Sequence, residues 1–269
     1  MAEAFVQPAS EATPGRPASS PAEVIFEARS LEKRFGGLKA TDNLSLALEK
    51  GRIHALIGPN GAGKTTALSQ LSGELRPDAG EIRFQGRDIS GLDMPRRARI
   101  GIARSFQITA IFEEFSVRDN VALAVQSRAS HHFSFFRRAR RDRRLTEPAD
   151  AALAQVGLDA LADRRAADLA HGQKRQLEIA MALATEPTVL LLDEPMAGMG
   201  QAETETIVEL LERLRPSHAI LLVEHDMGVV FRLADTVSVL VNGAVLASGA
   251  PEAVRNDPDV QAAYLEESY

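Results

Sequence analysis

The sequence contains no cysteine. Disulfide bonds, thiolate metal sites and cysteine nucleophiles are therefore excluded. The sequence also lacks a run of about 18 consecutive apolar residues, which a membrane-spanning helix requires, and it lacks a basic start followed by an apolar segment. We therefore expect a protein that stays in the cytoplasm.

An excess of basic residues is missing as well. The formal net charge is −6, from 31 Lys and Arg against 37 Asp and Glu. Proteins that bind nucleic acid generally carry a basic face that contacts the phosphate backbone, so no nucleic-acid partner is expected. The length of 269 residues and the hydrophobic fraction of 45% favour one α/β domain with an inserted lobe.

The chain divides by composition. Residues 1–22 are rich in proline and small residues and too poor in large apolar groups to fold alone, so we expect a disordered tail. Residues 23–269 are predicted to form the folded domain. Its residues from about 108 to 167 are predicted to form an inserted helical lobe, with a basic insertion from about 126 to 148.

Several elements follow from local patterns. The apolar runs 52–57 and 219–223 predict strands buried in a parallel sheet. Gln85-Gly86 and Asn242-Gly243 predict hairpin turns, so antiparallel strands accompany the parallel core. Apolar residues at helical spacing from Ile207 to Leu214 predict a helix.

A glycine-rich loop follows the first of these strands. Its complete spacing, between a strand and a helix, favours a phosphate-binding loop over a chance glycine-rich turn. We expect Lys64 to contact the β- and γ-phosphates, Thr65 to bind magnesium and Thr66 to contact another phosphate. The loop consists of Gly58, Pro59, Asn60, Gly61, Ala62, Gly63, Lys64, Thr65 and Thr66.

Two carboxylates end a later apolar run, Leu190 to Leu192. Asp193 emerges from a buried strand and is predicted to hold magnesium. Glu194 beside it is predicted to orient and polarise the attacking water, which favours hydrolysis over transfer to a second substrate. The alternative is a strand-end acidic pair followed by Pro195.

A third segment, Leu169 to Gln173, precedes these carboxylates. Apolar residues at helical spacing follow it, so Gly172 and Gln173 lie near a helix N-terminus, which attracts phosphate. A second phosphate-binding surface has no obvious use inside one subunit. Its presence therefore implies two copies of the chain that close over ATP.

With these three motifs in order, residues 24–267 resemble the ATP-binding subunit of an ABC transporter. The resemblance implies an α/β fold of the P-loop NTPase class, with a mixed-sheet core, an antiparallel β subdomain and the inserted helical lobe. It implies ATP and Mg²⁺ as cofactors. It also implies a dimer in which each ATP lies between the Lys64 loop of one subunit and the Ala170, His171, Gly172 and Gln173 segment of the other.

The resemblance assigns three more residues. Gln107 would sense the metal and the attacking water, His225 would contact the γ-phosphate, and Phe35 would stack on adenine. Together with Glu194 and Lys64, Gln107 and His225 form the predicted catalytic set, and Gln107 joins Thr65 and Asp193 at magnesium. Each has an alternative: Phe35 as a core residue, Gln107 as a surface amide and His225 as a helix cap.

Two positions depart from the family pattern. Ala170 stands where many relatives have serine, so a hydroxyl contact to the γ-phosphate is absent. Gly200 ends a loop where many relatives have aspartate. Both variations resemble the amino-acid importer branch, so an active site is still expected.

Other stretches resemble importers of branched-chain or hydrophobic amino acids, with urea and short-amide importers close by. They are 34–38, 224–227 and 257–265. The implied partners are a second copy or a related ATPase, two integral membrane permeases and, indirectly, a solute-binding protein. The protein would then be peripheral on the inner face of the cell membrane. A lipid-exporter motor, or a non-transport ABC ATPase that remodels soluble complexes, is the alternative.

The basic insertion combines Phe133, Phe135 and Phe136 with six arginines between Arg137 and Arg144. A solvated or membrane-adjacent helix is favoured over RNA binding because the chain is acidic overall. His131 and His132 are adjacent and offer no zinc-ligand spacing. We therefore expect no metal other than magnesium.

Overall fold

The computed structural model describes residues 23–105, 111–128 and 142–265. The predicted tail, Gln107 and residues 129–141 of the basic insertion lie outside the described residues.

The larger of two sheets has six strands in the order β10-β9-β3-β8-β7-β6. Neighbouring strands are parallel except for β10, which is antiparallel to β9. Every residue of β3, β7 and β8 is buried, as the continuous apolar runs predict. The strands are β3 (Ile53–Ile57), β6 (Ile102–Arg104), β7 (Val189–Asp193), β8 (Ala219–Val223), β9 (Thr236–Val241) and β10 (Ala244–Gly249).

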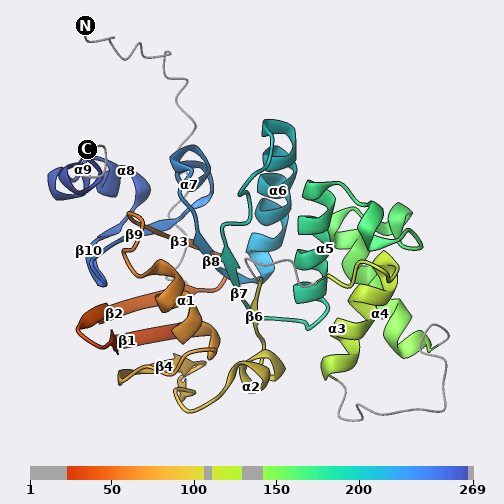
Figure 1. The fold of residues 1–269 in the computed structure, drawn as a ribbon, viewed down its shortest axis with the longest axis horizontal. Helices are drawn as coiled ribbons and strands as arrows, with labels where there is room; N and C mark the ends of the chain where they lie inside the picture. Colours follow the sequence, from red (N-terminus) through yellow and green to blue (C-terminus); the bar gives the residue numbers. More distant parts are fainter. Residues whose placement is uncertain (1–22, 106–110, 129–141, 266–269) are drawn as a thin grey trace, which may run out of the picture.

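The smaller sheet is antiparallel, in the order β2-β1-β4-β5. Helix α1 (Lys64–Ser72) lies between the two sheets, where it contacts β2, β6 and β7 (Figure 1). The predicted mixed-sheet core with an antiparallel β subdomain is therefore confirmed. The strands of this sheet are β1 (Val24–Phe35), β2 (Leu38–Glu49), β4 (Ala79–Phe84) and β5 (Arg87–Asp88).

Both predicted hairpins are present. Gln85 and Gly86 join β4 to β5 with φ of 49° and 76°, and Asn242 and Gly243 join β9 to β10 with φ of 48° and 83°. Two successive residues of positive φ match the turn type whose twist suits a two-residue hairpin.

Helices cover the other face of the larger sheet. Leu190 and Leu192 of β7 share an apolar cluster with α6 and α7, whereas Val189 and Leu191 share one with α1 and the smaller sheet. Alternation along the strand thus builds two layers of core. The helices are α6 (Gln201–Leu214) and α7 (Met227–Leu233); the short helix η4 (Arg215–Ser217) follows α6, and α8 (Pro251–Arg255) and α9 (Pro258–Leu265) come later in the chain.

A helical lobe forms one end of the molecule (Figure 1). Its three long helices pack on one another, and α5 also contacts β6 of the sheet. Helix α5 lies beyond the range 108–167 that the sequence indicates for the lobe. The lobe contains α3 (Val117–Arg128), α4 (Arg143–Val156), η2 (Asp159–Leu161), η3 (Ala166–Asp168) and α5 (His171–Leu183). Among the described residues, none of the helices is both long and apolar enough to cross a membrane.

Helix α1 is anchored at its C-terminal end by a buried arginine. Arg97, on α2 (Met94–Arg99), is 1% exposed, and burial lowers its pKa to about 10, so it stays charged at neutral pH. Its guanidinium donates to backbone carbonyls, at 2.8 to 3.4 Å: those of Gln70, Leu71, Ile89, Ser90 and Leu92. The carbonyls of Gln70 and Leu71 belong to the last turn of α1, where carbonyls have no partner within the helix, and that of Gln70 also accepts from the N–H of Gly73.

We expect Arg97→Met to lower the free energy of unfolding by about 3 kcal/mol, because the hydrogen bonds from its guanidinium to five carbonyls are lost. Urea denaturation of the two proteins measures the difference. Arg99→Met on the exposed side of α2 is the control and should change stability little. Equal stability of the two variants would show that Arg97 does not hold α1.

Candidate nucleotide-binding site

Two of the three predicted motifs, the glycine-rich loop and the acidic pair, meet at one edge of the larger sheet. Strands β3, β7 and β8 are parallel, and Val223 pairs with both Leu56 and Asp193. The glycine-rich loop follows β3, Glu194 follows β7 and Glu224 follows β8. Ligands of open α/β sheets bind at this carboxyl edge.

The shape of the glycine-rich loop depends on two close backbone contacts. A Cβ atom on Gly58 would lie 2.1 Å from the carbonyl oxygen of Leu240 in β9, and one on Gly63 would lie 2.1 Å from that of Ala40 in β2. Both residues also have positive φ, 148° and 103°. Only glycine meets both demands. The backbone of the loop thus packs closely against strands of both sheets.

Lys64 opens α1, and its ammonium group folds back over the loop. Nζ donates to the carbonyl oxygens of Gly58 and Pro59, at 2.5 and 2.9 Å. The N-cap Gly63 supplies no side-chain acceptor to the N–H groups of the first turn. A cation and a helix N-terminus therefore converge on the loop, and this arrangement fits a phosphate group.

Asp193 is the best placed residue for magnesium. Its side chain is 3% exposed, and its Oδ2 atom accepts from Nη2 of the buried Arg104 at 3.0 Å. This ion pair gives the buried carboxylate a charged partner at its Oδ2 atom. Among the described residues, no group of three His, Asp or Glu forms a metal cage. The arrangement fits Mg²⁺, which binds through one or two carboxylates together with phosphate oxygens.

Glu194 has a backbone conformation that few non-glycine residues adopt, with φ of 43°. Its N–H donates to the carbonyl of Val223, at 2.9 Å, and its own carbonyl accepts from Nη2 of Arg175 at 2.8 Å. Its side chain is 26% exposed, and Oε1 lies 3.8 Å from Nδ1 of His225. Backbone strain of this kind is frequent at functional sites.

His225 is not a helix cap. Its side chain is 65% exposed. The cap of α7 is Asp226, whose Oδ1 accepts from the N–H groups of Gly228 and Val229. That alternative for His225 is therefore wrong, and its imidazole is free of a capping role beside Glu194.

Glu224 links the turns that follow β7 and β8. It is 1% exposed and accepts from the N–H groups of Met196 and His225, at 3.1 and 3.2 Å. Burial raises the pKa of Glu224, and these hydrogen bonds oppose the rise. The buried carboxyl of Glu224 therefore joins the loop after Glu194 to His225 through hydrogen bonds.

The predicted second phosphate-binding surface is the start of α5. Ala170 is its N-cap and provides no side-chain acceptor, while Oε1 of Gln173 accepts from the N–H of Ala170 at 3.1 Å. The N–H of Gly172 donates to Oε1 of Glu203 at 3.0 Å. Figure 1 shows α1 between the sheets and α5 in the helical lobe, so the two helix starts belong to different parts of the protomer.

Helix α5 is joined to the loop after Glu194. Arg175 donates to the carbonyls of Glu194 and Pro195, at 2.8 and 3.1 Å, and Nε2 of His171 lies 3.3 Å from the carbonyl of Ala197. Arg175 also pairs with Glu178, at 2.6 Å. Helix α5 thus positions the backbone of Glu194, the predicted catalytic carboxylate.

Sequence reasoning missed Arg104, Arg175 and Glu203. No local pattern marks Arg104, whose partner Asp193 is far away in the chain. Arg175 follows His171 by four residues, so helical spacing predicts that the two side chains lie on the same face of a helix. The spacing does not predict what that face contacts. Glu203 has a clearer signal, because it stands three residues after Gly200, the spacing of a capping box.

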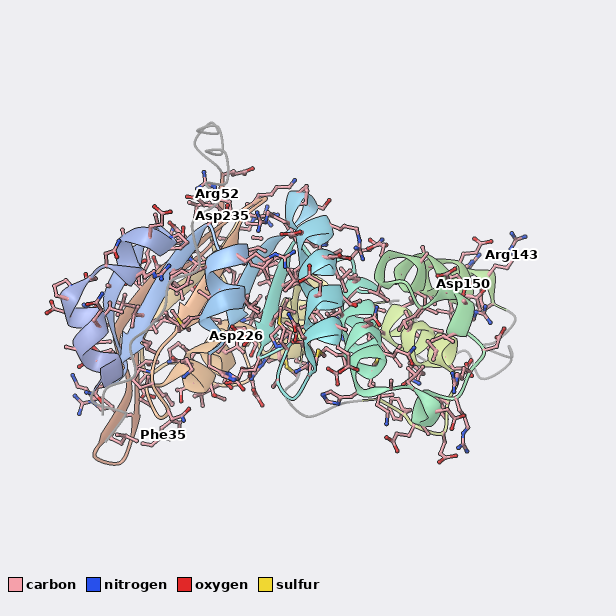
Figure 2. All side chains as sticks on the ribbon, turned by 90° about the horizontal axis from the view of Figure 1, so that it is seen from above. Phe35, Arg52, Arg143, Asp150, Asp226 and Asp235 are labelled. Carbon is pink, nitrogen blue, oxygen red and sulfur yellow. The ribbon has the colours of Figure 1, made fainter. Side chains whose placement is uncertain are left out.

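Phe35 is not a core residue. It ends β1 with 51% of its surface exposed, and Nζ of Lys33 lies 5.8 Å from the centre of its ring. Figure 2 shows it beside the tip of the β1–β2 hairpin. The core alternative is therefore wrong, and the ring is available to stack on a ligand.

A family model described as "ABC transporter" matches residues 41–197. The chain belongs to the ABC transporter family. It is an ATPase subunit with the ABC-type fold. A second model, "Branched-chain amino acid ATP-binding cassette transporter", matches residues 244–265.

Individual relatives extend the match over nearly the whole chain. The chain is 40% identical to the high-affinity branched-chain amino acid transport ATP-binding protein BraF of Pseudomonas aeruginosa and 41% identical to LivG of Escherichia coli. Both matches cover 91% of this chain and 98% of the relative. The ADP form of MJ1267, an ATP-binding cassette of an ABC transporter, superposes with a TM-score of 0.81 at 28% identity, covering 90% of this chain and 99% of that one.

Proposed function

We propose that this protein hydrolyses ATP to drive import of branched-chain or other hydrophobic amino acids. The observation that carries the substrate class is the similarity to BraF and LivG over 91% of the chain, together with the match of residues 244–265 to the branched-chain family model. The imported solute binds elsewhere in the complex. This subunit supplies the energy.

The site residues have distinct roles in this proposal. Lys64 and the N–H groups of the glycine-rich loop bind the phosphates, and Thr65 and Asp193 hold Mg²⁺, which when bound neutralises charge on the phosphates. Glu194 accepts hydrogen bonds from the attacking water and aligns it. His225, beside Glu194, contacts the γ-phosphate, and Gln107 senses the water and the metal.

The nucleotide is shared between two subunits. Each ATP contacts the Lys64 loop of one protomer and the α5 start of the other, because the two phosphate-binding surfaces lie in different parts of one chain (Figure 1). Closure of the dimer follows from higher affinity of ATP for the closed state. The contacts of Arg175 with Glu194 and Pro195 carry the closure to the catalytic carboxylate.

The partners are two integral membrane permeases and, indirectly, a solute-binding protein, with this subunit peripheral on the inner face of the membrane. A structural relative, cbiO1 of Clostridium perfringens, is described as part of the transporter complex cbiONQ and matches at 27% identity with a TM-score of 0.74. The second ATPase is another copy of this chain or a related subunit.

The test is to purify the intact membrane complex and measure its ATP hydrolysis with the solute-binding protein present. Leucine, isoleucine or valine should stimulate turnover, and urea and short amides should not. Stimulation by urea alone would reassign the solute to the alternative class. Recovery of the protein from cells without any membrane subunit would reject a role in transport.

In the proposed site, Phe35→Ala should weaken ATP binding by roughly tenfold, because adenine loses an aromatic surface for stacking. Fluorescence titration with a labelled ATP analogue measures the affinity. Leu38→Ala is a matched control, because Leu38 is 67% exposed and pairs with Phe35 across the same hairpin. Equal affinities of the two variants would place adenine elsewhere.

A further inference from the structure

Glu203, in the first turn of α6, connects two helix starts. Its Oε1 accepts from the N–H of Gly172 in α5, at 3.0 Å, and its Oε2 accepts from the N–H of Gly200, the N-cap of its own helix, at 3.3 Å. One carboxylate therefore joins the start of α5 to Gly200, which ends the segment that follows Glu194 and Pro195.

The absence of a hydroxyl at position 170 explains why this contact matters. A serine at an N-cap accepts a hydrogen bond from the first turn, whereas Ala170 has no group that can do so. The dipole of α5 favours a negative charge at that end. Glu203 provides this charge from another helix.

The glycine at position 172 allows the carboxylate to approach. A Cβ atom there would lie 2.8 Å from Oε1 of Glu203 and 3.1 Å from its Cγ and Cδ atoms. The carboxylate thus packs directly on the bare backbone of Gly172. In the proposed dimer, the phosphate of the partner subunit's ATP approaches the same turn of helix.

A carboxylate and a phosphate are both anions and compete for one N–H group. We propose that Glu203 is a positioning residue of the composite ATP site, which occupies the anion position at the start of α5 and leaves it when the partner's nucleotide arrives. Glu203 thereby sets the ATP concentration at which the dimer closes. This inference rests on the proposed function, since it requires ATP shared between two subunits.

The carboxylate of Glu203 is also connected, through the segment that follows β7, to Glu194. The segment from Glu194 to Gly200 is held by Arg175, by His171 and by Glu203 itself. Release of Glu203 from Gly172 frees the carboxylate that also holds Gly200, and Gly200 is the end of this segment opposite Glu194. In this chain Glu203 therefore links Gly200, at the end of that segment, to the start of α5.

The experiment compares Glu203→Gln and Glu209→Gln in a chain that already carries Glu194→Gln, so that bound ATP is not consumed. Glu209 lies on the exposed face of the same helix, and its replacement removes the same charge. Light scattering after size-exclusion chromatography measures the ATP concentration at half-maximal dimer. We expect Glu203→Gln to lower it roughly three- to tenfold relative to Glu209→Gln, because a neutral amide competes less with phosphate.

ADP affinity separates this effect from damage to the subunit's own nucleotide loop. Glu203→Gln should leave ADP binding by monomers unchanged, because only the partner's phosphate meets Glu203. Glu203→Ala removes the carboxylate in a second way and should shift dimer formation in the same direction. The melting temperature of each variant confirms that it is folded.

An unchanged or higher ATP requirement in both Glu203 variants overturns the inference, since a purely structural role would weaken the dimer. Failure of the parent Glu194→Gln chain to form any ATP-dependent dimer, alone or with a related ATPase, counts against the proposed shared site instead. The two failures are thus distinguishable in one series of measurements.

Discussion

Replacement of Glu194 by glutamine should reduce ATP hydrolysis at least about a hundredfold, the usual effect of removing a general base. The amide keeps the size of the side chain but cannot take up a proton from water. The strained backbone at φ of 43° and the hydrogen bond to Val223 should persist, because neither involves the carboxylate. Phosphate release from the purified chain measures the loss.

Binding of ATP should survive in this variant. The loop around Lys64 and the buried Asp193 are unaltered, so the affinity for ATP should stay within about threefold of the parent. Glu252→Gln on the exposed face of α8 is the control and should retain full turnover. Undiminished hydrolysis by Glu194→Gln would remove this residue from the role of base.

Replacement of Gly172 by aspartate should also reduce turnover at least about a hundredfold, the scale seen when a donor to a developing charge is lost. The new carboxylate would begin from a Cβ atom 2.8 Å from Oε1 of Glu203, and it would place a second negative charge where the proposed site receives phosphate. Unlike Glu194→Gln, this variant should fail to form an ATP-dependent dimer.

Gly91→Asp is the control for Gly172→Asp in the same series of measurements. Gly91 is exposed, and nothing lies within 4 Å of a Cβ atom placed there, so Gly91→Asp adds the same group without a clash. Its turnover should match the parent. ATP binding to monomers should be equal in both aspartate variants. Full turnover by Gly172→Asp would mean that the start of α5 does not take part in the reaction.

Much of the fold was predictable because its signals are local. Strands buried on both faces, such as β8, must be continuously apolar, and two-residue hairpins such as Asn242-Gly243 need residues that accept positive φ. The order of motifs along the chain likewise predicted a phosphate-binding loop after one buried strand and a pair of carboxylates after another. These features depend on neighbours in sequence.

Contacts between distant side chains were not predictable in this way. The pairing of Arg104 with Asp193 requires β6 to be next to β7, and the contact of Glu203 with Gly172 requires α6 to begin beside α5. The exposure of Phe35 depends on where its hairpin ends relative to the core. A pattern of residue types does not contain this information, because several topologies are consistent with it.

Gly58 lies close to Leu240, and Gly63 lies close to Ala40. The conformation of the glycine-rich loop therefore depends on residues outside the motif. Its backbone conformation is imposed by strands on either side, and the N–H of Gly243 in the β9–β10 turn also donates to the carbonyl of Ala62, at 2.9 Å. If residues 58–66 alone were transplanted into another sheet, the sequence of the motif would be kept, but the neighbouring strands that fix its backbone conformation would be missing.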